Sequence, residues 1–283
     1  MAMKNVFVVG AGVMGNGIVQ VSAEAGYNVT MMDIKDEFVK RGLATIDKNL
    51  DRKVKKGTIK ESDKAAALSR IKTTLDIKDA RDADLVVEAA LEELGVKKNI
   101  FKQLDEVCPP NAILATNTSS LPIGEIATAT KRPQQVIGIH FMNPVPVMKG
   151  VEVIPGRYTA PGVLEAAKAY IKSLDKEPCE ARDYAGFIVS RLVDALMNEA
   201  ILCVMDGNKP EEVDKAVKLC LNHPMGPLEL CDLAGADIVL HGLETMYAEF
   251  GERLMPAPLL KNMVRSGDLG RKTGRGFYDY TQK

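Results

Sequence analysis

The sequence is poor in several residue types that often carry chemistry. It has no tryptophan, three histidines and five cysteines in 283 residues. The cysteines are odd in number and form no CxxC spacing, which indicates reduced intracellular thiols and argues against both a disulfide framework and a metal site. Because histidine is so scarce, the setting of each one carries information about function.

The sequence also lacks an excess of charge and long apolar runs. It has 37 lysines and arginines against 38 acidic residues, a formal net charge of -1. This balance argues against a generic nucleic-acid binder but leaves room for a local basic patch. No uncharged apolar segment reaches membrane-spanning length, and the start, MAMKNVFVVGAG, has no secretory h-region. We therefore expect a soluble cytoplasmic protein with neither a nucleic-acid nor a membrane partner.

The pattern along the chain predicts an α/β fold. Short apolar runs read as strands and alternate with helical patterns, which favours a mainly parallel sheet of the Rossmann type with helices on both faces. The expected strands are 5–10, 28–34, 71–75, 84–90, 112–117, 136–142, 151–154 and about 177–182. Residues 36–70 read as two charged helices joined near Lys56, an insertion in the form of a helical hairpin.

After about Asp183 the pattern changes to long helical periodicity, and everything that follows reads as helix and loop. We therefore predict two domains. Residues 1–184 form a dinucleotide-binding domain, and residues 185–283 form an all-α domain for substrate binding and dimerisation. The apolar faces of these helices exceed what one small bundle buries, so we expect a homodimer.

The stretch Gly10-Ala11-Gly12-Val13-Met14-Gly15 has the GxGxxG spacing. It follows a strand and opens a helix, and Asp33 ends the next strand about 20 residues on, as in sites that hold a dinucleotide. Gly10 allows the tight turn, Gly12 lets backbone amides approach a pyrophosphate, and Gly15 permits close helix packing. Asp33 suits the ribose hydroxyls and repels a 2′-phosphate, which favours NAD over NADP. The alternative is a purely structural glycine turn.

His140 and Glu152 each lie within an apolar run of the stretch VIGIHFMNPVPVMKGVEVI. Buried polar groups need partners, and the two meet if their strands run antiparallel with NPVP as the bend. Next to a nicotinamide cofactor, such a histidine suits the exchange of a hydroxyl proton, with the carboxylate fixing its tautomer. The residues alone leave a second interpretation open, a core histidine and an unrelated glutamate that are each satisfied elsewhere.

Several longer motifs resemble the L-3-hydroxyacyl-CoA dehydrogenase family, and most closely its bacterial 3-hydroxybutyryl-CoA dehydrogenases. The resemblance covers essentially the whole chain and rests on VVGAGVMGNGI, VVEAALEEL, ATNTSSLPI, GIHFMNPVPVMKGVEVI, AGFIVSRL, NHPMGPLEL and GRKTGRGFYDY. It implies reversible, NAD-dependent hydride transfer at the 3-position of short-chain (S)-3-hydroxyacyl-CoA, which interconverts 3-hydroxybutyryl-CoA and acetoacetyl-CoA in fatty acid and butyrate metabolism.

The resemblance also assigns roles at matching positions. His140 is the general acid/base and Glu152 orients it, while Ser119 contacts the substrate hydroxyl or the cofactor. Asn117 and Asn143 line the nicotinamide side of the pocket. Glu92, Lys97 and Lys272 resemble cofactor contacts, although each is also consistent with an ordinary surface charge.

Coenzyme A needs local positive charge for its phosphates, and the insertion supplies a basic cluster. Lys56 matches the coenzyme A lysine of the family. Its neighbours Lys48, Arg52, Lys53 and Lys55 are equally compatible with a solvated helix face.

One position departs from the family. Serine stands at Ser190, where the family motif PGFxxNR has an asparagine whose amide donates toward the carbonyl region of the substrate. Serine reaches less far, and the loss of such a donor is typically worth a few kcal/mol of barrier. The alternative function is therefore a catalytically weak or non-enzymatic protein of the same fold that binds NAD and coenzyme A. His223 and His241 lie in settings that suggest structural roles.

Overall fold

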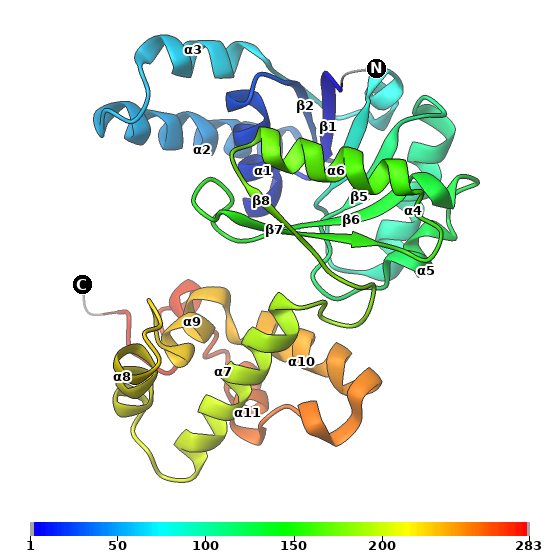
Figure 1. Ribbon diagram of the computed structural model, residues 1–283. Helices are drawn as coiled ribbons and strands as arrows, with labels where there is room; N and C mark the ends of the chain where they lie inside the picture. Colours follow the sequence, from blue (N-terminus) through cyan, green and yellow to red (C-terminus); the bar gives the residue numbers. More distant parts are fainter. Residues whose placement is uncertain (1–2, 282–283) are drawn as a thin grey trace. The chain divides into compact units, whose positions relative to one another are not determined.

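The computed structural model describes residues 3–281, and the chain divides into two compact units. The first unit ends at Asp183 and the second begins at Tyr184. Figure 1 shows a sheet with helices in the first unit and helices in the second. The predicted fold class is confirmed.

The first unit is built on one eight-stranded sheet with the order β3-β2-β1-β4-β5-β6-β7-β8. All neighbouring pairs are parallel except β6 and β7, which run antiparallel. The sheet is therefore mainly parallel, as the alternation of strands and helices predicts. The strands are β1 (Asn5–Val9), β2 (Asn28–Met32), β3 (Ile71–Thr74), β4 (Leu85–Glu88), β5 (Ile113–Thr116), β6 (Val136–Phe141), β7 (Gly150–Pro155) and β8 (Glu177–Glu180).

Helices cover both faces of this sheet, so its strands are buried on both sides and read as continuous apolar runs. Val6 and Val8 belong to a core shared with α1, α2 and α6, whereas Phe7, which points to the opposite face, is equally buried. The expected helical hairpin is α2 and α3, which pack beside α1 (Figure 1). The helices are α1 (Val13–Glu24), α2 (Asp36–Lys55), α3 (Glu61–Ser69), α4 (Leu94–Val107), α5 (Ile123–Ala127) and α6 (Pro161–Ser173), with 3-10 turns η1 (Ile77–Asp82) and η2 (Pro133–Gln135).

The second unit is helical and has its own apolar core, in which α7, α9, α10 and α11 meet. Two buried acids tie its C-terminal tail: the carboxylate of Asp232 accepts the backbone amides of Phe277 and Tyr278, and Asp214 accepts the hydroxyl of Tyr278. The elements are α7 (Val189–Met205), α8 (Pro210–Cys220), α9 (Pro227–Ala234), α10 (Ala236–Phe250), α11 (Pro258–Ser266), η3 (Gly251–Leu254) and η4 (Arg271–Thr273). No helix among residues 3–281 has the length and apolar character needed to cross a membrane.

Candidate active site

The glycine-rich loop joins β1 to α1 and has no room for side chains at two of its glycines. Gly10 has a φ of 103°, and a Cβ there would lie 2.5 Å from the carbonyl oxygen of Ala89. A Cβ on Gly15 would lie 1.9 Å from the carbonyl oxygen of Gly10. Gly12, by contrast, is exposed and has nothing within 4 Å of its Cβ position. Backbone atoms therefore fill the space beside Gly10 and Gly15, whereas the space beside Gly12 is open. A dinucleotide pyrophosphate is expected to approach the backbone at Gly12.

Asp33 follows β2 and binds the same loop. Its carboxylate accepts the backbone amide of Ala11 at 2.7 Å and that of Ile34 at 2.7 Å. Val13 and Met14 form the first turn of α1, whose N-terminus favours an anion. A carboxylate has about four acceptor positions, so two amides leave capacity for ribose hydroxyls. These residues fit an adenosine diphosphate group without a 2′-phosphate.

His140 and Glu152 face each other across the antiparallel pair of β6 and β7. They are register partners, and the imidazole Nδ1 lies 2.8 Å from Glu152 Oε2. His140 is 7% exposed and Glu152 is 1% exposed. The predicted contact is confirmed, and the interpretation as two unrelated groups is wrong. A carboxylate on Nδ1 fixes the tautomer, so that Nε2 is the nitrogen suited to proton exchange.

Ser119 lies in the loop after β5, and His140 lies on the neighbouring strand β6. The loop is joined to β6 by Asn117, whose Oδ1 accepts the amide of Phe141 at 2.8 Å. Asn143 is exposed in the turn after β6. Because carboxyl ends of parallel strands share one edge of a sheet, the loop after β5 and the end of β6 belong to the same edge.

Glu92 and Lys97 follow β4 and are linked by an ion pair of 3.2 Å. Glu92 Oε1 accepts the amide of Ser119 at 2.8 Å, so it contacts the Ser119 loop directly. Lys97 is 1% exposed, and its Nζ also lies 2.8 Å from Glu88 Oε1. The interpretation of Lys97 as a surface charge is therefore wrong. Sequence reasoning missed Glu88, although an acid at the end of the apolar run DLVVE was the signal.

The basic cluster lies at the end of α2 and just beyond it. Arg52, Lys55 and Lys56 are exposed there, which agrees both with binding of coenzyme A and with a solvated helix face, so their role stays a prediction. Lys53 differs because its Nζ is paired with Glu24 Oε1 at 2.5 Å, on α1. Lys53 thus has an internal counter-ion and joins the helical hairpin to α1.

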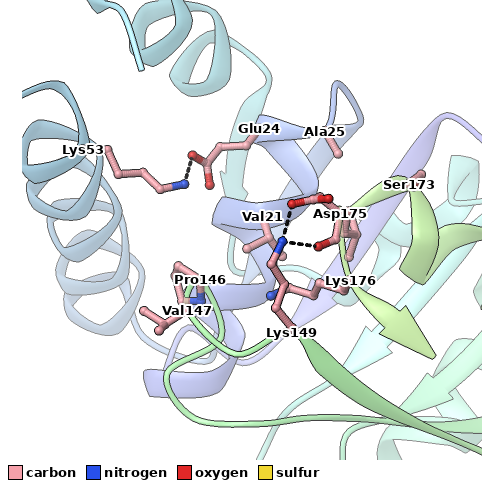
Figure 2. A pocket seen from close by; sticks show the side chains of 11 residues that line it. Val21, Glu24, Ala25, Lys53, Pro146, Val147, Lys149, Ser173, Asp175 and Lys176 are labelled. Atoms are coloured by element: carbon pink, nitrogen blue, oxygen red, sulfur yellow. Dashed lines mark hydrogen bonds and ion pairs between the residues drawn. The ribbon is translucent and has the colours of Figure 1, made fainter. Parts of the chain in front are cut away.

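Lys53 also borders a cavity of about 320 Å³, drawn in Figure 2. Lys149 points to Asp175 across it, and Lys176 donates to the carbonyl oxygens of Val145 and Met148, both at 2.6 Å. Burial, and then neighbouring lysines, lower the pKa of Lys176. Because Lys176 holds the chain segment that joins β6 to β7, this region supports the strand pair that carries His140 and Glu152.

Two of the predicted site residues belong to the second unit. Ser190 is the second residue of α7 and is half-buried. Lys272 is exposed in η4 and forms an ion pair with Asp237. Their roles toward substrate and cofactor stay predictions.

Known proteins share this fold. The profile for the NAD binding domain of 3-hydroxyacyl-CoA dehydrogenase matches residues 5–184, and that for the C-terminal domain of the same enzyme matches residues 186–280. The chain belongs to the 3-hydroxyacyl-CoA dehydrogenase family.

Individual relatives are similar over their whole length. A protein of Bacillus subtilis named probable 3-hydroxybutyryl-CoA dehydrogenase is 46% identical over 100% of this chain and 99% of the relative. The 3-hydroxybutyryl-CoA dehydrogenase of Clostridioides difficile is 47% identical over 97% of this chain and 99% of the relative. The crystal structure of (S)-3-hydroxybutyryl-CoA dehydrogenase from Ralstonia eutropha is 44% identical and has a TM-score of 0.95, covering 99% of this chain and 100% of that chain.

Proposed function

We propose that the protein is an NAD-dependent 3-hydroxybutyryl-CoA dehydrogenase that interconverts (S)-3-hydroxybutyryl-CoA and acetoacetyl-CoA. The single observation that carries this proposal is the buried pair of His140 and Glu152, 2.8 Å apart at a strand end of a dinucleotide-binding unit. A histidine held by a carboxylate is the arrangement that moves a hydroxyl proton beside a hydride transfer.

The chain's own residues account for the proton and for substrate placement. In oxidation, neutral His140 accepts the proton of the 3-hydroxyl at Nε2, and Glu152 stabilises the resulting imidazolium through Nδ1. In reduction, the imidazolium returns that proton to the oxygen of the 3-oxo group. Ser119 donates a hydrogen bond to the same oxygen, and Ser190 donates toward the carbonyl region of the thioester. NAD, held by the loop from Gly10 to Gly15 and by Asp33, supplies the hydride acceptor or donor when bound.

The first experiment is the rate of NADH oxidation with acetoacetyl-CoA, measured for the chain as given and for Ser190→Asn. We expect turnover in the given chain, with a further increase in kcat for Ser190→Asn because an amide reaches further than a hydroxyl. Turnover only in Ser190→Asn identifies a weak enzyme. Absence of turnover in both chains contradicts the proposed reaction and favours a non-enzymatic protein that binds NAD and coenzyme A.

The substrate class is tested at Lys56, since a free 3-hydroxy acid would give the basic cluster nothing to bind. We expect Lys56→Ala to raise KM for acetoacetyl-CoA about fivefold at low salt, because an exposed charge pair contributes up to about 1 kcal/mol. The effect should shrink as salt is added. The matched control is Lys78→Ala, an exposed lysine of η1 outside the α2–α3 hairpin. An unchanged KM in Lys56→Ala removes the support for binding of coenzyme A at this cluster.

We propose a homodimer in the cytoplasm as the working state of the enzyme. Support for the dimer comes from large apolar side chains exposed on the second unit, among them Leu192, Leu219 and Ile238. The five cysteines are free thiols, as suits a reducing compartment. A monomer in sedimentation at micromolar concentration contradicts the dimer, and recovery in the membrane fraction of lysed cells contradicts the location.

A further inference from the structure

A charged cluster lies buried at the end of β4. Glu88 is 0% exposed and Lys97 is 1% exposed, and their carboxylate and ammonium groups are 2.8 Å apart. Glu88 also accepts the amide of Ala90 at 2.7 Å and the hydroxyl of Thr116 at 2.7 Å. Every oxygen of this carboxylate is thus engaged, which fixes the position of the Lys97 ammonium. Burying two charges is expensive, and apolar residues often serve stability as well or better.

The Lys97 ammonium also binds Glu92, which connects the cluster to the Ser119 loop. Lys97 Nζ lies 3.2 Å from Glu92 Oε2. The other oxygen, Oε1, accepts the hydroxyls of Thr118 at 2.5 Å and Ser119 at 3.2 Å, and the amides of Ser119 at 2.8 Å and Ser120 at 3.3 Å. One carboxylate oxygen therefore accepts hydrogen bonds from three consecutive residues of the loop.

Glu92 is well placed to act as an anion at this point. Burial by itself would raise the pKa of Glu92, but the Lys97 ammonium and the donors of Thr118 and Ser119 hold this pKa below its usual range. An ionised acceptor makes stronger hydrogen bonds to backbone amides than a neutral one. The ionic contact with Lys97 thus strengthens the hold of Glu92 on the loop.

We propose that Glu88 and Lys97 are positioning residues of the active site: their buried ion pair holds Glu92, and Glu92 holds Ser119 at the carboxyl end of β5. The inference rests on the proposed function, because it takes Ser119 as a substrate contact. Neither Glu88 nor Lys97 touches the substrate in this scheme. They act through two links, from Lys97 to Glu92 and from Glu92 to the Ser119 loop.

The competing hypothesis is that Glu88 and Lys97 only stabilise the fold. Two variants distinguish this hypothesis from a positioning role. Lys97→Met removes the ammonium, keeps the apolar stem and leaves Glu88 buried as an unpaired charge. Adding Glu88→Gln neutralises that charge, so the double variant should regain stability without regaining the link to Glu92. The matched control is Lys98→Met, the next residue of α4, whose ammonium is half-exposed and pairs with Glu125.

We expect Lys97→Met to lower both the melting temperature and kcat for acetoacetyl-CoA reduction. In Glu88→Gln/Lys97→Met the melting temperature should recover, while kcat stays about 10 to 100-fold below that of the wild-type chain, the size of effect that a displaced contact produces. Introducing Ser119→Ala into this double variant should then have little further effect, since the contact is already lost. Recovery of kcat together with the melting temperature, or a full additional effect of Ser119→Ala, overturns the proposal.

Hydrogen exchange of the segment 113–121 tests whether Glu92 holds the Ser119 loop, and it does so without relying on catalysis. Exchange at the amides of Ser119 and Ser120 should rise in Glu88→Gln/Lys97→Met and stay unchanged in Lys98→Met. If the wild-type chain shows no turnover, the proposed function fails while this measurement still decides the inference. If the Lys97 variants do not fold, Glu92→Gln keeps an acceptor oxygen but loses the ionic link, and unchanged exchange in that variant overturns the proposal.

Discussion

Replacing His140 by alanine is expected to lower kcat for acetoacetyl-CoA reduction by about 10³-fold, the middle of the range for loss of a general acid or base. His140 is the group that returns the proton in the proposed reaction, and Glu152 behind it is too buried to replace it. The rate of NADH oxidation at saturating substrate measures the change. Binding of NADH, followed by its fluorescence, should survive, because the loop from Gly10 to Gly15 is untouched.

Two further variants keep this result interpretable. Removing His140 leaves Glu152 as a buried charge, so His140→Gln is measured alongside because its amide can still donate to that carboxylate. It cannot exchange a proton, and we expect a similar loss of kcat. The control is His241→Ala, an exposed histidine of α10, for which kcat should not change. A value within tenfold of wild type for His140→Gln contradicts the assignment of the proton-transfer residue.

The pH dependence of the two reaction directions also tests the role of His140. Oxidation needs the neutral imidazole and reduction needs the imidazolium, so a falling pH should slow oxidation and a rising pH should slow reduction. Glu152→Gln removes the carboxylate that holds Nδ1 of His140, and it is expected to lower kcat in both directions because the imidazole loses its orientation. Identical profiles in both directions, with chemistry rate-limiting, are incompatible with this mechanism.

The parts of the site that follow from local pattern could be predicted from the sequence. The GxGxxG spacing places Gly10 and Gly15 where the close contacts with Ala89 and Gly10 require glycine. Two apolar runs separated by a turn, each with one polar residue, predict the meeting of His140 and Glu152, and the register of β6 and β7 confirms it. Gly10 and Gly15 lie in one loop, and His140 and Glu152 lie on consecutive strands, whereas the contact of Gly10 with Ala89 comes from the pairing of β1 with the distant strand β4.

Residues whose partners come from several elements were harder to predict. Lys97 was compatible with a surface charge because lysine is usually exposed, yet Glu88 from the preceding strand holds it in the interior. Lys53 was compatible with the coenzyme A cluster or with a solvated helix face, but it is paired with Glu24 on α1. The sequence contains these acids but does not show which cation each one meets, because that depends on how helices pack against the sheet.

Asp194 is a buried acid of α7 that sequence reasoning also missed, although its spacing indicated burial. It precedes the core residues Met197 and Ile201 by three and seven positions, which places it on the same helix face. Asp194 is 8% exposed, and a Cβ on Gly242 of α10 would lie 2.6 Å from its Oδ2. Burial raises the pKa of Asp194 to about 7.

This raised pKa predicts that the wild-type chain loses stability as pH rises. The pKa in an unfolded chain is about 3.9, so between about pH 4 and pH 7 the folded state keeps a proton that the unfolded state has lost. The free energy of unfolding therefore falls through that window and levels off above it. A difference of about three pKa units corresponds to at most about 4 kcal/mol.

Asp194→Asn removes this ionisation and is expected to stabilise the chain at pH 8 by about 1 to 4 kcal/mol, with little difference at about pH 4. Thermal melts at both values measure it, and a gain of this size should raise the melting temperature at pH 8 by several degrees. Asp206→Asn, at the exposed end of α7, is the matched control and should change stability by less than about 0.5 kcal/mol at either pH. An equal shift for Asp194→Asn at both pH values would mean that shape or hydrogen bonding, not ionisation, governs this position. Loss of stability at pH 8 would mean that the folded chain uses the charge of Asp194.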